Sequence, residues 1–517
     1  MGPDKGALGN NRTIVFEGKK TPRRQIELTR INEERIIAMN ILKKMLMKDA
    51  SEEVKASVAY TICGILTKCL SLITLPIFTR ILSTDEYGLS TIYSSTAAIL
   101  IIFTSLQLPY GTLSTAMIKY KEDRNGYLSS ICAITTVLTA IYIVICVIFR
   151  NHFEKWLDLP LVLLVVMGIE TLFSTANAAW MGQQRFEYQY KRVVAVTLGT
   201  SVAAVAVSLL VVCFSTEKGI ARVISNAIVV SVVGFAIYVM IMIKGKKPFN
   251  KEYWRFALSF NIPLIPYYLS QVIFNQSDRL MINSYCGRGD AAIYGVAYSL
   301  ATILTFVVTA IHSSYTPWIF ERIDKKELTD NRRVSLILSA GIAFMLLGVI
   351  ALAPEIIHIM AGEKYMDAIW VVPPVAMSIL LLYYADLFDC LLFFYEAKSF
   401  LTLAAIFSAI VNVILNAIFI PKFGFVAAAY TTLASYLILA VLDYVYMRVI
   451  CKKKNVDSNL YNIKGLVLLF VVFGFIGFLA MSLYNYPIIR YSIITVVFII
   501  MFIFREKLMK LFKSVQK

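Results

Sequence analysis

The chain has 517 residues, of which 58% are hydrophobic and 16% are charged, with a formal net charge of +17. Soluble domains are nearer to half apolar and a quarter charged, so this composition and the mean hydropathy of +0.70 exclude an ordinary soluble protein. The apolar residues form blocks that suit membrane helices of about 20 residues, and the alternating segments of about 10 residues typical of a transmembrane β-barrel are absent. The sequence therefore predicts an all-α polytopic membrane protein.

The first fifty or so residues differ from the rest because they are rich in both charge signs. Ile37, Ile41 and Met45 follow one another at intervals of four, with Leu42 beside them, which indicates a helix. No long apolar core accompanies the basic residues, so the segment is not a cleavable signal peptide. We expect residues 1–53 to form a basic cytoplasmic extension, with a helix lying on the inner membrane surface.

Fourteen apolar segments follow, and each is a predicted transmembrane helix. They are 56–79, 88–112, 127–149, 159–182, 193–214, 220–243, 259–284, 291–316, 334–353, 368–394, 401–420, 425–447, 465–484 and 487–504. Lys and Arg concentrate in alternate loops and in the C-terminal tail, and this bias sets the orientation of membrane proteins. The bias places both termini in the cytoplasm, although loop 150–158 on the outer side also holds two basic residues.

The net positive charge thus belongs mainly to the cytoplasmic face. We expect anionic phospholipids of the inner leaflet to be its partners, and no nucleic acid.

A repeated pattern divides the chain. Residues 78–93 read "FTRILSTDEYGLSTIY" and residues 277–298 read "SDRLMINSYCGRGDAAIYGVAY", so in both an Arg is followed by a polar turn and then by Tyr-Gly. Six predicted spans separate the copies, so both point the same way across the membrane. Such parallel repeats hold the substrate path between them. We therefore predict two six-helix lobes, 54–250 and 251–450, and a region 451–517 with two extra helices and a basic tail.

The glycines of this repeat, Gly88 and Gly295, open corresponding helices. Either they serve as hinges between the halves, or they permit close packing of helices.

Ionisable residues inside the membrane cost roughly 2.5–3.5 kcal/mol each and face the bundle interior or a wet cavity. The candidate substrate-binding residues are the basic ones, Lys68, Arg80 and Arg279. The candidate ion-coupling or counter-charge residues are the acidic ones, Glu170, Asp278, Asp386 and Asp389. Arg222, Asp443 and Arg490 lie close enough to span ends to reach the interface, so they are not candidates here.

Each candidate has a structural alternative. Lys68 could be neutralised by Glu170 or by an acidic residue of span 10. Arg80 could reach the outer headgroups or brace a loop, and Asp278 and Arg279 could form an internal pair. Asp386 and Asp389 are three residues apart and share a helix face, which suits a proton or cation site or a set of counter-charges.

The sequence indicates no cofactor, metal site or catalytic centre. The eight cysteines contain no C-x-x-C pair, the three histidines are far apart, and no P-loop motif occurs. Several cations in a cavity suit an anion such as a sugar pyrophosphate, whereas a pocket for cationic drugs would need acidic and aromatic walls.

Four stretches, in order, resemble signature regions of the Wzx-type oligosaccharide flippases, the polysaccharide-transporter branch of the superfamily that also contains the MATE multidrug exporters. The stretches are "LPIFTRILSTDEYGLSTIY" (75–93), "NIPLIPYYLSQVIFNQSDRLMI" (261–282), "LAPEIIHIMAGEKYMDAIWVVPPV" (352–375) and "NVILNAIFIPKFGFVAAAYTTLASY" (412–436). The resemblance covers residues 54 to 450. The charged N-terminal extension departs from the pattern of that family.

The resemblance implies a V-shaped fold of two lobes around a cavity in a bacterial inner membrane. It also implies transport of an oligosaccharide repeat unit on undecaprenyl pyrophosphate for O-antigen, capsule or exopolysaccharide assembly, alongside a polysaccharide polymerase and chain-length proteins. The two extra helices would then form a groove for the lipid tail. An ion-coupled exporter of small cations or drugs and a membrane scaffold without transport activity are the alternatives.

Overall fold

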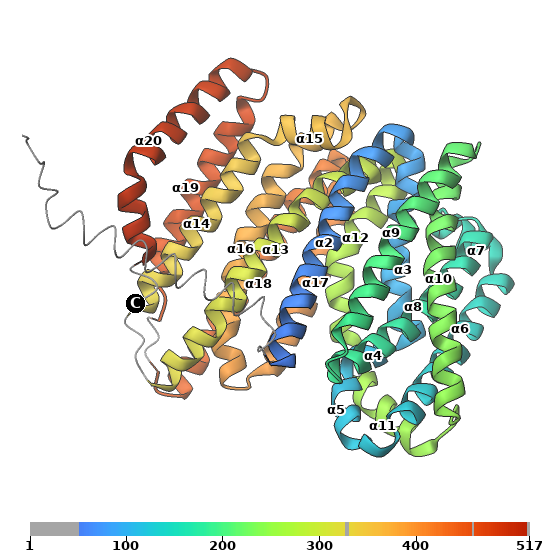
Figure 1. Cartoon of the computed structure of the whole chain (residues 1–517). Coiled ribbons are helices and arrows are strands. Elements are labelled where there is room, and N and C mark those ends of the chain that lie inside the picture. Colours follow the sequence, from blue (N-terminus) through green and yellow to red (C-terminus); the bar gives the residue numbers. More distant parts are fainter. Residues whose placement is uncertain (1–50, 326–329, 457–459, 514–517) are drawn as a thin grey trace, which may run out of the picture. The chain divides into compact units, whose positions relative to one another are not determined.

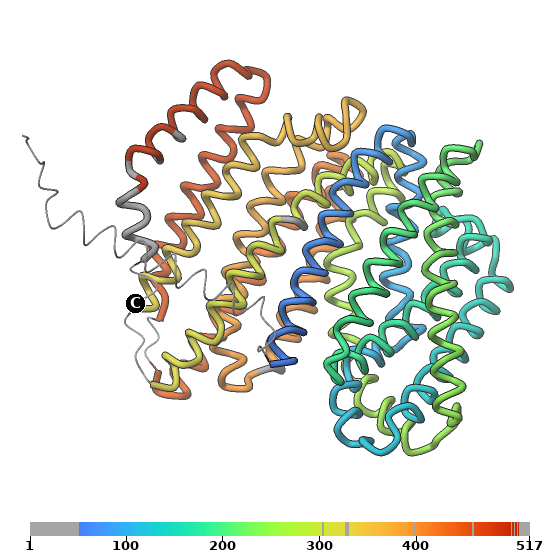
Figure 2. The backbone as a smooth tube through the Cα atoms, in the orientation of Figure 1, coloured from blue at the N-terminus to red at the C-terminus, as the bar shows by residue number. Residues whose placement is uncertain are grey.

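The computed structural model describes residues 51–325, 330–456 and 460–513, and the surface helix predicted near residue 40 lies outside them. Two compact units divide the chain, 1–62 and 63–517; of the first, the described part is the start of helix α2. Within the described residues every regular element is a helix (Figures 1 and 2), which confirms the predicted all-α fold.

The first half of the helices comprises α2 (Glu52–Ile81), α3 (Thr84–Ser105), α4 (Leu108–Gly111), α5 (Leu113–Lys119), η1 (Lys121–Asp123), α6 (Arg124–Ile148), α7 (Arg150–Leu157), α8 (Leu161–Phe186), α9 (Tyr190–Phe214) and α10 (Lys218–Gly245). The second half comprises α11 (Lys251–Asn261), η2 (Ile262–Leu264), α12 (Ile265–Cys286), α13 (Arg288–Asp324), α14 (Asn331–Ala351), α15 (Ala353–Ala361), η3 (Glu363–Trp370), α16 (Val372–Phe394), α17 (Lys398–Phe423) and α18 (Val426–Lys453). Two further helices follow, α19 (Ile463–Ser482) and α20 (Pro487–Lys513).

Thirteen of the fourteen predicted spans correspond to helices long and apolar enough to cross a membrane. The fourteenth falls in α20, where the apolar stretch described as Pro487–Val497 is shorter. The second predicted span ends early, because Leu106 and Gln107 adopt left-handed backbone angles (φ 47° and 54°) and stop α3 at Ser105.

Helices at corresponding positions of the two halves pack in the same way. In the first half α10 packs against α8 and α9, and α8 against α6. In the second half α18 packs against α16 and α17, and α16 against α14. The contacts therefore follow the repeat that the sequence indicates. Helix α19 packs on α14 and α16 of the second half.

The two halves meet where α3 crosses α12 and α13. A Cβ on Gly88 would lie 2.2 Å from the Arg288 carbonyl oxygen, so only glycine permits this approach of α3 to α13. Close by, Arg288 Nε donates to Asp158 Oδ2 at 2.5 Å, and Arg288 Nη2 donates to Asp158 Oδ1 at 2.7 Å.

A short helix positions Asp158 for this ion pair. The predicted outer loop 150–158 contains α7, which ends at Leu157 and has Asp158 as its C-cap. Glu154 of α7 accepts a hydrogen bond from the backbone N–H of Leu161 at 2.7 Å, and this bond, with Arg150, holds the pKa of Glu154 below its ordinary value. The bond ties α7 to the first turn of α8.

Candidate functional site

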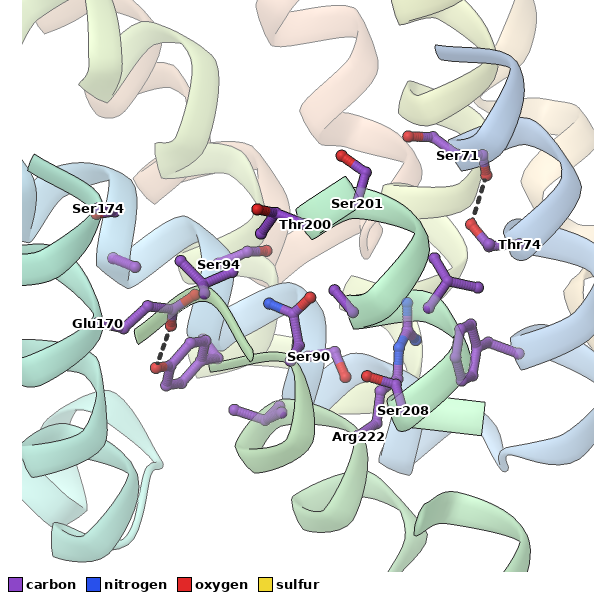
Figure 3. A pocket seen from close by; sticks show the side chains of 18 of the residues that line it. Ser71, Thr74, Ser90, Ser94, Glu170, Ser174, Thr200, Ser201, Ser208 and Arg222 are labelled. Atoms are coloured by element: carbon purple, nitrogen blue, oxygen red, sulfur yellow. Dashed lines mark hydrogen bonds between the residues drawn. The ribbon is translucent and has the colours of Figure 1, made fainter. Parts of the chain in front are cut away.

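The largest of the cavities described here lies in the first half and has a volume of about 660 Å³. Five helices, α2, α3, α8, α9 and α10, contribute its wall (Figure 3). Many of the side chains in the wall are polar; they are Thr67, Ser71, Thr74, Ser90, Tyr93, Ser94, Glu170, Thr171, Ser174, Thr200, Ser201, Ser208, Arg222 and Asn226. We call this space the first cavity.

A second cavity of about 270 Å³ lies where α3 and α10 of the first half meet α12 and α13 of the second. Ser90, Ser94 and Arg222 line both cavities, so the two spaces adjoin. Arg279 and Gln276 of α12 line the second cavity only. Two guanidinium groups, one from each half, therefore border it.

Arg222 is held by aromatic rings and not by an acid. Its guanidinium carbon lies 4.4 Å from the ring centroid of Phe78 and 4.4 Å from that of Tyr87. Its Nη1 atom is buried and makes no hydrogen bond, and no acidic side chain among the described residues is within ion-pair distance. A buried donor without a partner costs about 1–3 kcal/mol, and more when it is charged. An anion in either cavity would remove this cost.

The sequence-based analysis set Arg222 aside because it lies near a span end. In the structure it lies in the cavity wall, five residues into α10. The repeat contained a signal: counted from Gly219 and Gly424, Arg222 corresponds to Ala427. A charge in one copy where the other copy has alanine indicates a role confined to the first half.

Arg279, a candidate substrate-binding residue in the sequence-based analysis, lies in the wall of the second cavity. Its Nη1 donates to the Asn275 carbonyl oxygen at 3.0 Å and to Gln276 Oε1 at 2.7 Å. Its guanidinium carbon lies 4.5 Å from the ring centroid of Tyr298. Both hydrogen-bond acceptors of Arg279 are therefore neutral, and no acidic side chain among the described residues lies within ion-pair distance of it.

The other two predicted cations lie elsewhere. Lys68 is exposed on α2 and lines neither cavity. Arg80 is also exposed, and its Nη2 donates to the Ile359 carbonyl oxygen of α15 at 3.0 Å. Lys364 donates to the Leu82 carbonyl oxygen at 2.6 Å beside it. Arg80 therefore braces the end of α2 against α15, which is the loop-bracing alternative considered for it.

Glu170 lies in the wall of the first cavity, where its carboxylate accepts a hydrogen bond from the Tyr93 hydroxyl at 2.7 Å (Figure 3). No basic side chain among the described residues pairs with it. Lys68, a proposed partner, is on the exposed side of α2.

Asp278 is 2% exposed and joins four helices. It accepts hydrogen bonds from Tyr294 of α13 at 2.6 Å, Asn416 of α17 at 2.7 Å and Thr432 of α18 at 2.8 Å. All three donors are neutral. Among the described residues, no group of three or more His, Cys, Asp and Glu side chains could hold a metal ion.

Asp386 and Asp389 line a third cavity of about 330 Å³ between α12, α16, α17 and α18. Asp443, which the sequence-based analysis set aside, lines it too and is 1% exposed. Asp389 Oδ1, Asp443 Oδ1 and Ser408 Oγ are buried in this wall without a hydrogen-bond partner. The second half therefore holds an acidic, partly unsatisfied cavity, separate from the two arginines.

A family model and a curated relative both match the sequence. The model of the family described as polysaccharide biosynthesis protein matches residues 54–323. The chain is 23% identical over 281 residues to the Lsg locus putative protein 1 of Haemophilus influenzae, which covers 53% of this chain and 67% of that protein.

Among solved structures, the lipid II flippase MurJ in an inward closed conformation superposes with a TM-score of 0.63 at 15% identity, over 84% of this chain and 100% of that one. A multidrug resistance MATE family transporter of the MOP superfamily, in an inward-facing conformation, gives a TM-score of 0.60 at 12% identity, over 78% of this chain and 99% of that one. The fold is therefore the one shared by MurJ and the MATE transporters.

Proposed function

We propose that this chain, which belongs to the polysaccharide biosynthesis protein family, is a flippase for oligosaccharides linked through pyrophosphate to a lipid carrier. The observation that supports this best is Arg222, whose buried Nη1 has no partner and whose side chain borders two adjoining cavities. Guanidinium groups bind phosphate oxygens through paired, charge-assisted hydrogen bonds. A pyrophosphate is therefore a fitting ligand for this position.

The two cavities divide the headgroup between them. The pyrophosphate binds in the second cavity, between Arg222 of the first half and Arg279 of the second. The sugars occupy the adjoining first cavity, whose volume of about 660 Å³ is within the range of about 300–1,000 Å³ of ligand pockets. One pyrophosphate contacts both arginines. Because the arginines belong to different halves, the binding of the pyrophosphate depends on the position of one half relative to the other.

The carrier is undecaprenyl, and its tail stays in lipid beside α19 and α20. α19 exposes a row of apolar side chains; they include Val467, Leu468, Val471, Phe475 and Leu479. The chain lies in the bacterial inner membrane with both termini in the cytoplasm. Anionic phospholipids bind its basic cytoplasmic face. Its protein partners are a polymerase and chain-length proteins, in O-antigen, capsule or exopolysaccharide assembly. Glu170, Asp278, Asp386 and Asp389 are the proposed ion-coupling or counter-charge residues.

The acidic third cavity favours a second candidate function, cation-coupled export of small organic cations. Asp386, Asp389 and Asp443 face this space together with Tyr267 and Tyr436, and carboxylates with aromatic rings are suited to organic cations.

Reconstitution in liposomes distinguishes the two functions. The probes are a polyprenyl-diphosphate disaccharide with a fluorescent sugar, the matching polyprenyl-monophosphate disaccharide, and ethidium; the readout is the fraction of each probe accessible to an impermeant quencher. We expect movement of the diphosphate lipid, at least about tenfold slower movement of the monophosphate, and no ethidium transport. Ethidium transport without movement of the diphosphate lipid would establish the exporter instead.

A further inference from the structure

Most hydroxyl groups around the first cavity donate their hydrogens within the protein; Ser90 Oγ, which is buried without a partner, and Ser208 Oγ, which accepts from Ser225, do not. Most of the donating hydroxyls bond to a backbone carbonyl of their own helix, at distances between 2.8 and 3.1 Å. They include Thr67, Ser71 and Thr74 on α2, Ser94 on α3, Ser174 on α8 and Ser201 on α9. A hydroxyl has one hydrogen but two acceptor lone pairs. Toward a ligand, this wall therefore offers mainly acceptors.

Glu170 adds further hydrogen-bond acceptors to this wall. A carboxylate only accepts hydrogen bonds and can accept about four, whereas the one hydrogen bond Glu170 receives comes from Tyr93. In its ionised form, Glu170 has no ion-pair partner among the described residues. Arg222, the strong donor of this wall, lies on the opposite side of the view in Figure 3 from Glu170.

The first cavity is thus polarised, with a cation where it adjoins the second cavity and acceptors with a carboxylate elsewhere. A headgroup whose pyrophosphate contacts Arg222 extends its sugars toward the acceptors. Sugar hydroxyl, amino and amide N–H groups would pair with them. A sugar carboxylate would instead face Glu170 and acceptor oxygens, and placing like charges together is strongly unfavourable.

We infer that the first cavity selects neutral sugars and amino sugars and rejects uronic acids, with Glu170 as the residue that determines this specificity. The inference rests on the proposed function, because it takes the sugars of a lipid-linked oligosaccharide to occupy this cavity.

Binding to the purified full chain in lipid nanodiscs tests the inference. The probes are three polyprenyl-diphosphate disaccharides that differ only in the second sugar: glucose, glucosamine or glucuronic acid. We expect the wild-type chain to bind the glucose and glucosamine probes at least about tenfold more tightly than the glucuronate probe. Glu170→Gln should reduce this ratio to about threefold or less, since the amide removes the charge yet still accepts the bond from Tyr93.

Two further variants complete the test. Ser174→Asp adds a carboxylate to the same wall, one turn after Glu170 on α8 and on a different helix from Arg222, and should increase the discrimination against glucuronate. Glu321→Gln makes the same chemical change as Glu170→Gln at an exposed ion pair with Lys325 and should leave the ratio unaltered. Equal binding of glucose and glucuronate by the wild-type chain, or an unchanged ratio in Glu170→Gln, would overturn the inference alone. Failure of all three probes to bind would overturn the proposed function with it.

Discussion

Lys68 and Arg222 are both cations in apolar helices, yet their surroundings differ. Lys68 lies on α2, a helix long and apolar enough to cross a membrane, and its side chain is exposed and lines neither of the first two cavities. Arg222 is enclosed between two aromatic rings with a buried donor unpaired, so its charge is costly until a ligand compensates it. Burial without a partner, and not position in a predicted span, distinguishes a binding cation.

We therefore expect Arg222→Gln to weaken binding of a polyprenyl-diphosphate disaccharide by about 10- to 100-fold, the value of a hydrogen bond to a charged group. Arg222→Lys should bind with intermediate affinity, because it keeps the charge but loses the planar fork. Lys68→Gln should stay within about twofold of the wild-type chain, since Lys68 lines neither of the two cavities proposed to hold the headgroup. Titration calorimetry in nanodiscs measures all three. Loss of affinity in Lys68→Gln but not in Arg222→Gln would restore the assignment made from sequence.

The sequence predicted the spans well because the length of an apolar run is a local property that the membrane imposes on each helix separately. It placed Arg279 among the candidate cavity residues because this Arg lies within a predicted span and recurs in the repeated pattern. It missed Arg222 and Asp443 because distance to a span end says nothing about which way a side chain faces. The direction in which these side chains face depends on how α10 and α18 pack against neighbouring helices, which is a property of the assembled bundle.

At the scale of elements, the second half contains two buried aspartates with opposite surroundings. Asp278 receives three hydrogen bonds from three other helices, whereas Asp443 Oδ1 has no partner. The first carboxylate satisfies donors that would otherwise be buried alone. Asp443 Oδ1 accepts no hydrogen bond, so the free-energy cost of burying this carboxylate is uncompensated.

Removing the Asp278 carboxylate should therefore destabilise the fold, whereas removing the Asp443 carboxylate should not. Asp278→Ala leaves buried donors on Tyr294, Asn416 and Thr432 unpaired, at about 1–3 kcal/mol for each, and we expect a clear fall in the thermal unfolding temperature of the purified protein. Asp443→Ala is the matched control, being an equally buried Asp of the same half, and should leave that temperature unchanged or raise it. An equal fall in both variants would mean that lost volume, and not hydrogen bonding, sets the effect.

At the scale of the whole bundle, the two halves are joined at the end that the Lys and Arg bias assigns to the outside. Gly88 allows α3 to reach the Arg288 backbone, and the ion pair between Arg288 and Asp158 lies beside it. The close approach at Gly88 supports close packing as the role of that glycine. Alternating access by rocking of parallel halves requires this junction to separate once in every cycle.

A disulfide across the junction tests that requirement. A Cβ on Gly289 of α13 would lie 3.8 Å from the Thr84 Cβ of α3, within the roughly 3.5–4.5 Å that a disulfide needs. We expect Thr84→Cys with Gly289→Cys, in a Cys286→Ser background, to oxidise readily and to stop movement of the fluorescent diphosphate lipid in liposomes. Reduction should restore the movement, because the bond prevents only the separation of the halves.

Thr84→Cys alone and Gly289→Cys alone, each in the Cys286→Ser background, control for the substitutions themselves, and both should transport at the same rate under oxidising and reducing conditions. Binding measured on the oxidised double variant separates two kinds of failure. If the locked protein still binds the diphosphate lipid but does not move it, the junction is a gate that must open after binding. If the locked protein moves lipid at the normal rate, the halves do not need to part here, and the headgroup crosses by another route.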